Sequence, residues 1–80
     1  MSAEFKKFRE GIFSAMKNKP SYYRDGQFVF NYIDENYGVA RTVQFKDKID
    51  CFYNDKNIED FIAVSFKEFT KMDKITKYNG

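Results

Sequence analysis

Apolar side chains recur at intervals of three and four residues along three stretches of this chain, and this spacing is the strongest constraint on its fold. It places side chains on one face of an α-helix, which has about 3.6 residues per turn. The clearest stretch runs from about residue 57 to residue 74, with apolar positions at Ile58, Phe61, Ile62, Phe66, Phe69 and Met72. Similar patterns span residues 3–18 and 21–37. The sequence therefore predicts three amphipathic helices.

Residues that favour helix ends flank the first two stretches. Ser2 is a candidate N-cap of the first helix, and Pro20 is expected to stop it. Ser21 is a candidate N-cap of the second helix. Gly38 stands where a glycine in the left-handed conformation commonly ends a helix.

The remaining stretches are less uniform. Residues 39–51 contain β-branched Thr42 and Val43, which favour a strand, but no second convincing strand exists to pair with it. A short helix followed by a loop is therefore the favoured interpretation. Asn57 with Asp60 resembles a capping box at the start of the last helix, and residues 75–80 are expected to form a loose tail.

These features predict an all-α fold for residues 1–80, a single domain built as a small compact bundle of three main helices and a short fourth element. Eighty residues can bury one core, and ten Phe and six Tyr supply large side chains for it. The single cysteine excludes an internal disulfide. No stretch approaches the roughly 18 apolar residues of a membrane span. We expect a cytoplasmic protein.

Four residues of the first two helices are candidates for protein binding. Phe13, Phe28 and Tyr32 are the large residues that fit their helical stripes least well, and Arg24 lies near them in the sequence. If the second helix packs on two sides, its two aromatic residues are buried in the core. If they are exposed, aromatic side chains beside arginine are typical of interface hot spots. The sequence leaves both interpretations open.

Several kinds of chemistry lack the residues that they need. The chain has no histidine, the commonest general base and metal ligand. Cys51 has no neighbouring base to activate it and is expected to be a small buried side chain. Asp47, Asp50 and Asp55 could bind a divalent ion, but aspartates also populate turns and caps for local reasons. We therefore predict no enzyme, no catalytic or metal site and no cofactor.

The charge of the chain is unevenly distributed. Residues 1–24 carry a net charge of +4, residues 25–60 a net charge of −4 and residues 61–80 a net charge of +2. The basic ends either complement the acidic middle within the molecule or bind nucleic acid. The candidate nucleic-acid residues interleave cations with aromatic rings: Lys17, Lys19, Tyr22, Tyr23 and Arg24. Accessory nucleic-acid binding is therefore the alternative function.

Two motifs resemble a group of short, functionally unassigned bacteriophage and prophage proteins. That group has an R-x-G-Q-A-x-F-N helix followed by a D-P-F-Y-D-D turn and a short helix. The matching residues are Arg24, Gly26, Gln27, Phe30 and Asn31, and then Asp50, Phe52, Tyr53, Asp55, Ile58 and Phe61. Phe28 replaces a small residue of the group, and Cys51 replaces the proline. The resemblance covers roughly residues 22–64.

The resemblance implies an all-helical fold and a phage origin, without an activity to carry over. The Lys-, Phe- and Tyr-rich composition also resembles small early proteins of T-even-like phages, which often bind and redirect host proteins or counter host defences. We therefore expect a non-enzymatic protein that binds a host or phage protein in an infected bacterium. Within the motifs, we expect Arg24 or Gln27 to hold the turn at residues 50–55 by hydrogen bonds. Gly26 is expected to mark the close approach of another backbone segment.

Overall fold

The computed structural model describes the backbone of residues 3–79 and the side chains of residues 3–72. Within this part of the chain there is no strand. The elements are α1 (Ala3–Met16), α2 (Asp25–Tyr37), α3 (Ala40–Phe45), the 3₁₀ turn η1 (Asp55–Asn57) and α4 (Ile58–Asn79). The predicted all-α fold is confirmed, as is the short helix followed by a loop within residues 39–51.

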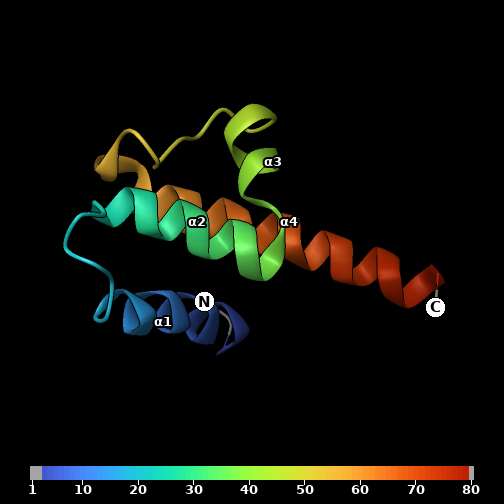
Figure 1. Ribbon diagram of the computed structural model, residues 1–80. Coiled ribbons are helices and arrows are strands. Elements are labelled where there is room, and N and C mark those ends of the chain that lie inside the picture. The colour runs from blue at the N-terminus through green and yellow to red at the C-terminus, as the bar shows by residue number, and fades with distance from the viewer. Residues whose placement is uncertain (1–2, 80) are drawn as a thin grey trace.

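Helices α2 and α4 form the centre of the bundle. Each contacts α1, α3, η1 and the other, whereas α1 and α3 make no contact with each other. Figure 1 shows the reason, since α1 and α3 lie on opposite sides of the α2–α4 pair. The C-terminal part of α4 extends beyond the other helices, and the longest dimension of the molecule is 41 Å.

The core lies between the apolar stripes of the helices. Its buried apolar residues are Phe8, Ile12, Val29, Phe30, Ile33, Val39, Ala40, Val43, Cys51, Phe61 and Ile62. A group of aromatic rings continues the core between α1, α4 and the end of α2, where Phe8 lies 4.7 Å from Tyr37 and 5.3 Å from Phe66, measured between ring centroids. Large rings thus supply much of the apolar surface that a chain of this length needs to bury.

The two ends of α2 differ in how well the sequence predicted them. Gly38 ends the helix as predicted, with φ of 70° and its N–H donated to the carbonyls of the preceding turn. The predicted start at Ser21 is wrong, because residues 20–23 form a separate turn in which the Tyr23 N–H bonds the Pro20 carbonyl oxygen at 3.1 Å. Tyr22 therefore precedes the helix, and it is 79% exposed.

The start of α4 also differs from the prediction. Asn57 belongs to η1, and its side-chain Nδ2 donates to the carbonyl oxygen of Asp50 at 2.8 Å, so the expected capping box with Asp60 is wrong. α4 continues to Asn79, through most of the predicted tail. The side chains of residues 73–80 and the predicted cap Ser2 lie outside the described part, so the looseness of residues 75–80 stays a prediction.

Candidate protein-binding groove

Asp50 organises the loop that leads from α3 to η1, and we call residues 50–55 the 50–55 turn. The Asp50 carboxylate accepts hydrogen bonds from the backbone N–H groups of Phe52 and Tyr53, at 3.2 and 3.0 Å. It also accepts one from Nε2 of Gln44 on α3, at 2.8 Å. Aspartate commonly holds turns in this way, because its short side chain reaches nearby backbone groups. The turn is thereby tied to α3.

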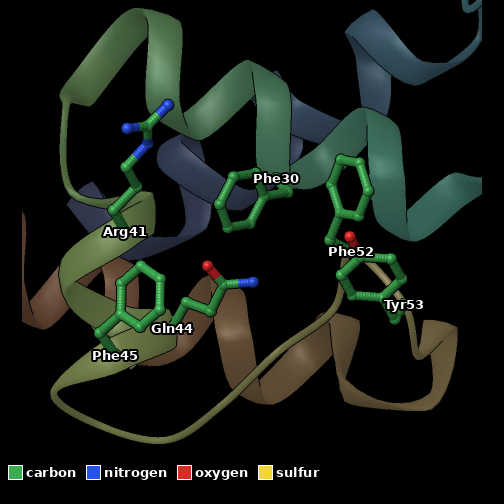
Figure 2. Close-up of a pocket in the computed structure, with 6 residues that line it drawn as sticks. All are labelled: Phe30, Arg41, Gln44, Phe45, Phe52 and Tyr53. Carbon is green, nitrogen blue, oxygen red and sulfur yellow. The ribbon is translucent and has the colours of Figure 1, made fainter.

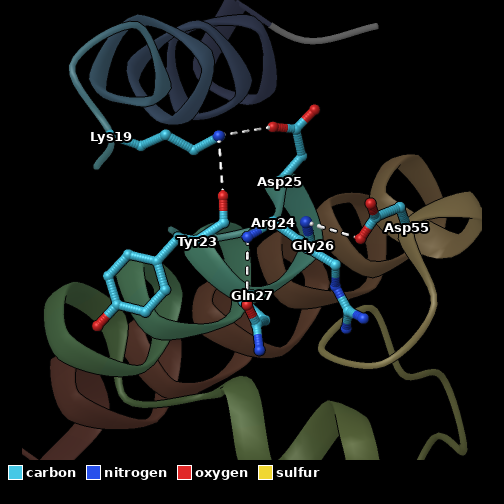
Figure 3. Close-up of polar contacts among 7 residues, drawn as sticks. All are labelled: Lys19, Tyr23, Arg24, Asp25, Gly26, Gln27 and Asp55. Atoms are coloured by element: carbon cyan, nitrogen blue, oxygen red, sulfur yellow. Dashed lines mark hydrogen bonds and ion pairs between the residues drawn. The ribbon is translucent and has the colours of Figure 1, made fainter. Parts of the chain in front are cut away.

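The beginning of α2 packs directly against the 50–55 turn at Gly26, which is buried. The Gly26 N–H donates to Oδ1 of Asp55 at 3.0 Å (Figure 3), and the Gly26 carbonyl accepts from the Cys51 thiol at 3.3 Å. A Cβ atom at position 26 would collide with the Cys51 carbonyl oxygen. The expected approach of another backbone segment to Gly26 therefore occurs, and that segment is the turn.

Arg24 and Gln27 complete the connection between α2 and the turn. Nη2 of Arg24 donates to the Phe52 carbonyl oxygen at 2.6 Å, which is the contact that the sequence led us to expect. Gln27 instead caps the helix, since its Oε1 accepts the backbone N–H of Arg24 at 3.1 Å (Figure 3). Asn31 makes no hydrogen bond among the described side chains. These contacts give most of the motif residues a structural role.

The turn and α3 together border a groove of about 260 Å³, shown in Figure 2 and called here the α3–turn groove. Its lining residues are Phe30, Arg41, Gln44, Phe45, Phe52 and Tyr53. Phe30 is buried and meets Phe52 edge to face, with ring centroids 5.5 Å apart. On the two sides, Phe45 is 67% exposed and Tyr53 is 76% exposed. The groove thus presents two large aromatic rings to solvent on a hydrogen-bonded frame.

The residues predicted for protein binding occupy other places. Phe28 and Tyr32 stack along α2 with centroids 6.0 Å apart, and both are half-buried. Phe13 is also half-buried on α1, under the guanidinium of Arg9, whose Cζ lies 4.7 Å from the ring centroid. Tyr32 and Phe13 pack against the core. Only Phe28 and Tyr32 are brought together, and the three rings form no strongly exposed patch.

The candidate nucleic-acid residues are partly engaged within the molecule. Nζ of Lys19 donates to the Tyr23 carbonyl oxygen at 2.9 Å and pairs with Asp25 at 3.4 Å (Figure 3). Arg24 is held by the turn. Lys17 and Tyr22 remain exposed, with the Tyr22 ring 4.9 Å from that of Tyr23.

Cys51, within the 50–55 turn, is fully buried. Burial, and after it the nearby Asp50 carboxylate, raise the pKa of its thiol to about 12. The thiol is therefore protonated at neutral pH and unsuited to nucleophilic attack. No cluster of three or more potential metal-ligating Cys, Asp or Glu side chains occurs in the described part of the chain.

Sequence reasoning did not select Arg41, Gln44 or Phe45 as site residues. The apolar spacing of Val39, Ala40 and Val43 was the signal that could have indicated them, because these three residues form the buried side of the short helix. Residues 41 and 45, four apart, must then share its outer side.

The fold and the groove define a small helical protein with a preformed aromatic surface groove. No protein-family model matches the chain, and no curated protein or solved structure is significantly similar to it. The resemblance to bacteriophage proteins therefore stays a prediction. None of the described helices is both long and apolar enough to cross a membrane.

Proposed function

We propose that this chain is a non-enzymatic interaction protein that binds a partner protein through the α3–turn groove. The observation that carries the proposal is the exposure of Phe45 and Tyr53 on two sides of one groove, beside Arg41. Aromatic residues and arginine dominate interface hot spots, because they bury large areas and retain a polar group for orientation.

The frame of the groove supports the same function. The Asp50 carboxylate accepts hydrogen bonds from the backbone N–H groups of Phe52 and Tyr53, and Arg24 donates a hydrogen bond to the Phe52 carbonyl oxygen. A surface held in place before binding loses less conformational entropy when a partner arrives. The motif residues would then act by positioning the groove.

The resemblance to bacteriophage proteins supports a phage-encoded protein that acts in the cytoplasm of an infected bacterium. Its partner would be a host or phage protein, and the biological role would be host takeover or counter-defence. Accessory nucleic-acid binding remains the second candidate function. Its support is weaker, because Lys19 and Arg24 are engaged in internal contacts.

Affinity capture from a bacterial lysate, followed by binding of the purified partner, tests the proposal. Three forms are compared: wild type, the double variant Phe45→Ser/Tyr53→Ser, and Tyr22→Ser as a control. Tyr22 matches the groove aromatics in exposure but lies away from the groove. We expect wild type and Tyr22→Ser to bind the same partner and the double variant to lose it.

Stability and nucleic-acid binding provide the controls. The substituted side chains are exposed, so the melting temperatures of all three forms should be close. Retention of the partner by the folded double variant would reject the groove as the binding surface. Salt-dependent binding of DNA or RNA that is lost in Tyr22→Ser would favour the alternative function.

A further inference from the structure

Arg41 is the charged residue that lines the α3–turn groove, and its guanidinium has no partner within the described side chains. The other two arginines of the chain are engaged. Arg9 makes two hydrogen bonds to Glu59, at 2.9 and 2.7 Å, and Arg24 donates to the Phe52 carbonyl. Figure 2 shows Arg41 on α3, one helical turn from Phe45. Its donors are therefore available to a ligand that lies along the groove.

Asp50, the acidic residue that bonds Gln44 of the groove lining, is already engaged. Asp50 accepts three hydrogen bonds, from Gln44 and from two backbone N–H groups. No Asp or Glu side chain is among the groove lining. Among the lining side chains the charge is thus that of Arg41, which is positive, although residues 25–60 carry a net charge of −4.

Gln44 adds a polar group of defined orientation. Its Nε2 is held by Asp50 at 2.8 Å, which directs the amide oxygen away from that carboxylate. In Figure 2 this oxygen points toward Phe30, which also lines the groove. It has no donor within the described residues, and a peptide N–H is the kind of donor that would satisfy it.

The volume of the groove indicates the kind of occupant. At about 260 Å³ it lies below the range of about 300–1,000 Å³ that is usual for small-molecule sites. An opening of this size suits one or two side chains of a peptide segment. Aromatic walls favour an apolar side chain, and a planar guanidinium pairs bidentately with a carboxylate.

We infer that the α3–turn groove binds a short acidic segment of the partner protein. An apolar side chain of the segment packs between Phe45 and Tyr53, and an adjacent Asp or Glu carboxylate pairs with Arg41. The Gln44 amide oxygen accepts a backbone N–H of the same segment. The inference rests on the proposed protein-binding function and specifies the chemistry of the partner.

Selection from a random displayed-peptide library on the immobilised full chain tests the inference. We expect wild type to enrich peptides in which Asp or Glu neighbours Phe, Tyr, Leu or Met. Synthetic fluorescein-labelled copies of the enriched peptides are then titrated and followed by fluorescence anisotropy. Arg41→Glu should weaken their binding by roughly tenfold or more. A second selection on Arg41→Glu should enrich Lys or Arg in place of the acidic residues.

A conservative control and the salt dependence separate charge pairing from general disruption. Arg41→Lys keeps the charge without the planar fork, so it should retain more binding than Arg41→Glu. Binding to wild type should weaken as salt increases. Thermal melts establish that each variant is folded.

The outcomes distinguish this inference from the proposed function. One outcome is a set of selected peptides without acidic preference, whose binding is lost in Phe45→Ser/Tyr53→Ser but unchanged in Arg41→Glu. That result would overturn the inference and retain the groove as the binding surface. Peptides unaffected by either variant, or no enrichment, would overturn both. Self-association of the chain abolished by the aromatic double variant would identify a second copy as the occupant and also overturn the inference.

Discussion

The backbone N–H of Gly26 donates to the carboxylate of Asp55 at 3.0 Å, which joins the beginning of α2 to the end of the 50–55 turn. The first N–H groups of a helix lack partners within the helix, and a carboxylate there is also favoured by the helix dipole. The absence of a side chain on Gly26 lets the turn approach this closely. The contact holds the turn that carries Phe52 and Tyr53.

Gly26→Ala should therefore destabilise the protein. The new Cβ would meet the Cys51 carbonyl oxygen and lie 2.6 Å from Oδ1 of Asp55, so the turn must move. We expect a loss of about 1–3 kcal/mol in the free energy of unfolding, measured by chemical denaturation. Gly11→Ala is the matched control, because Gly11 is exposed within α1 with open space around it. That change should stabilise the helix by up to about 1 kcal/mol, and equal responses of both variants would contradict the explanation.

Ser65→Ala should stabilise the protein. Ser65 is fully buried on α4, and its Oγ has no hydrogen-bond partner within the described residues. Removing a buried hydroxyl without a partner should contribute about 1 kcal/mol, and alanine also has the higher helix propensity. Ser14→Ala on α1 separates the two effects, because Ser14 is exposed. Thermal melts should give a larger increase for Ser65→Ala, and the explanation fails if the two increases are equal.

Asp47 and Glu68 should give the protein an unusual pH dependence. Burial raises the pKa of Asp47, and a hydrogen bond to Glu68 and the Glu68 charge raise it further. The pKa of Glu68 is lowered by its hydrogen bonds to Lys46 and Asp47. A raised carboxyl pKa contributes stability below the unfolded-state pKa, and this contribution is lost as pH rises through the folded-state value. The Glu68 contribution has the opposite sign and is lost as pH falls.

Asp47→Asn should raise the melting temperature at neutral pH. The asparagine amide can donate a hydrogen bond to Glu68 without carrying a negative charge. The loss of stability that accompanies the ionisation of Asp47 should therefore be absent from the variant. Melts between about pH 3 and pH 7 measure the effect. Asp60→Asn, an exposed carboxyl at the start of α4, is the control. An Asp47→Asn curve parallel to that of wild type would contradict a raised pKa of Asp47 in the folded protein.

Cys51 should be protected from thiol reagents in the folded protein. It is fully buried, and its raised pKa of about 12 leaves almost no thiolate at neutral pH. We expect no reaction with an aromatic disulfide reagent until denaturant unfolds the chain. Cysteine introduced by Ser14→Cys, together with Cys51→Ala, provides an exposed reference on α1. Fast labelling of native Cys51 would indicate that the turn opens without global unfolding.

Local features of the sequence determined the helices. The spacing of residues such as Ile58, Phe61 and Ile62 predicted the buried stripe of α4, and Gly38 predicted the end of α2. Such signals act over a few residues, through helical periodicity and the conformational freedom of glycine. The paired motifs also led to the contact between Arg24 and the 50–55 turn.

Only the tertiary structure decided which side chains remain exposed. Phe28, Phe45 and Tyr53 are all large aromatic residues, but only the last two line the groove, because α3 and the turn meet beside α2. Asn57 is a suitable helix cap by type, yet its side chain bonds Asp50 instead. Exposure and hydrogen-bond choice depend on segments far apart in the chain, and Gly26 meets Cys51 across 25 positions. Local propensity carries no information about such pairings, which packing alone determines.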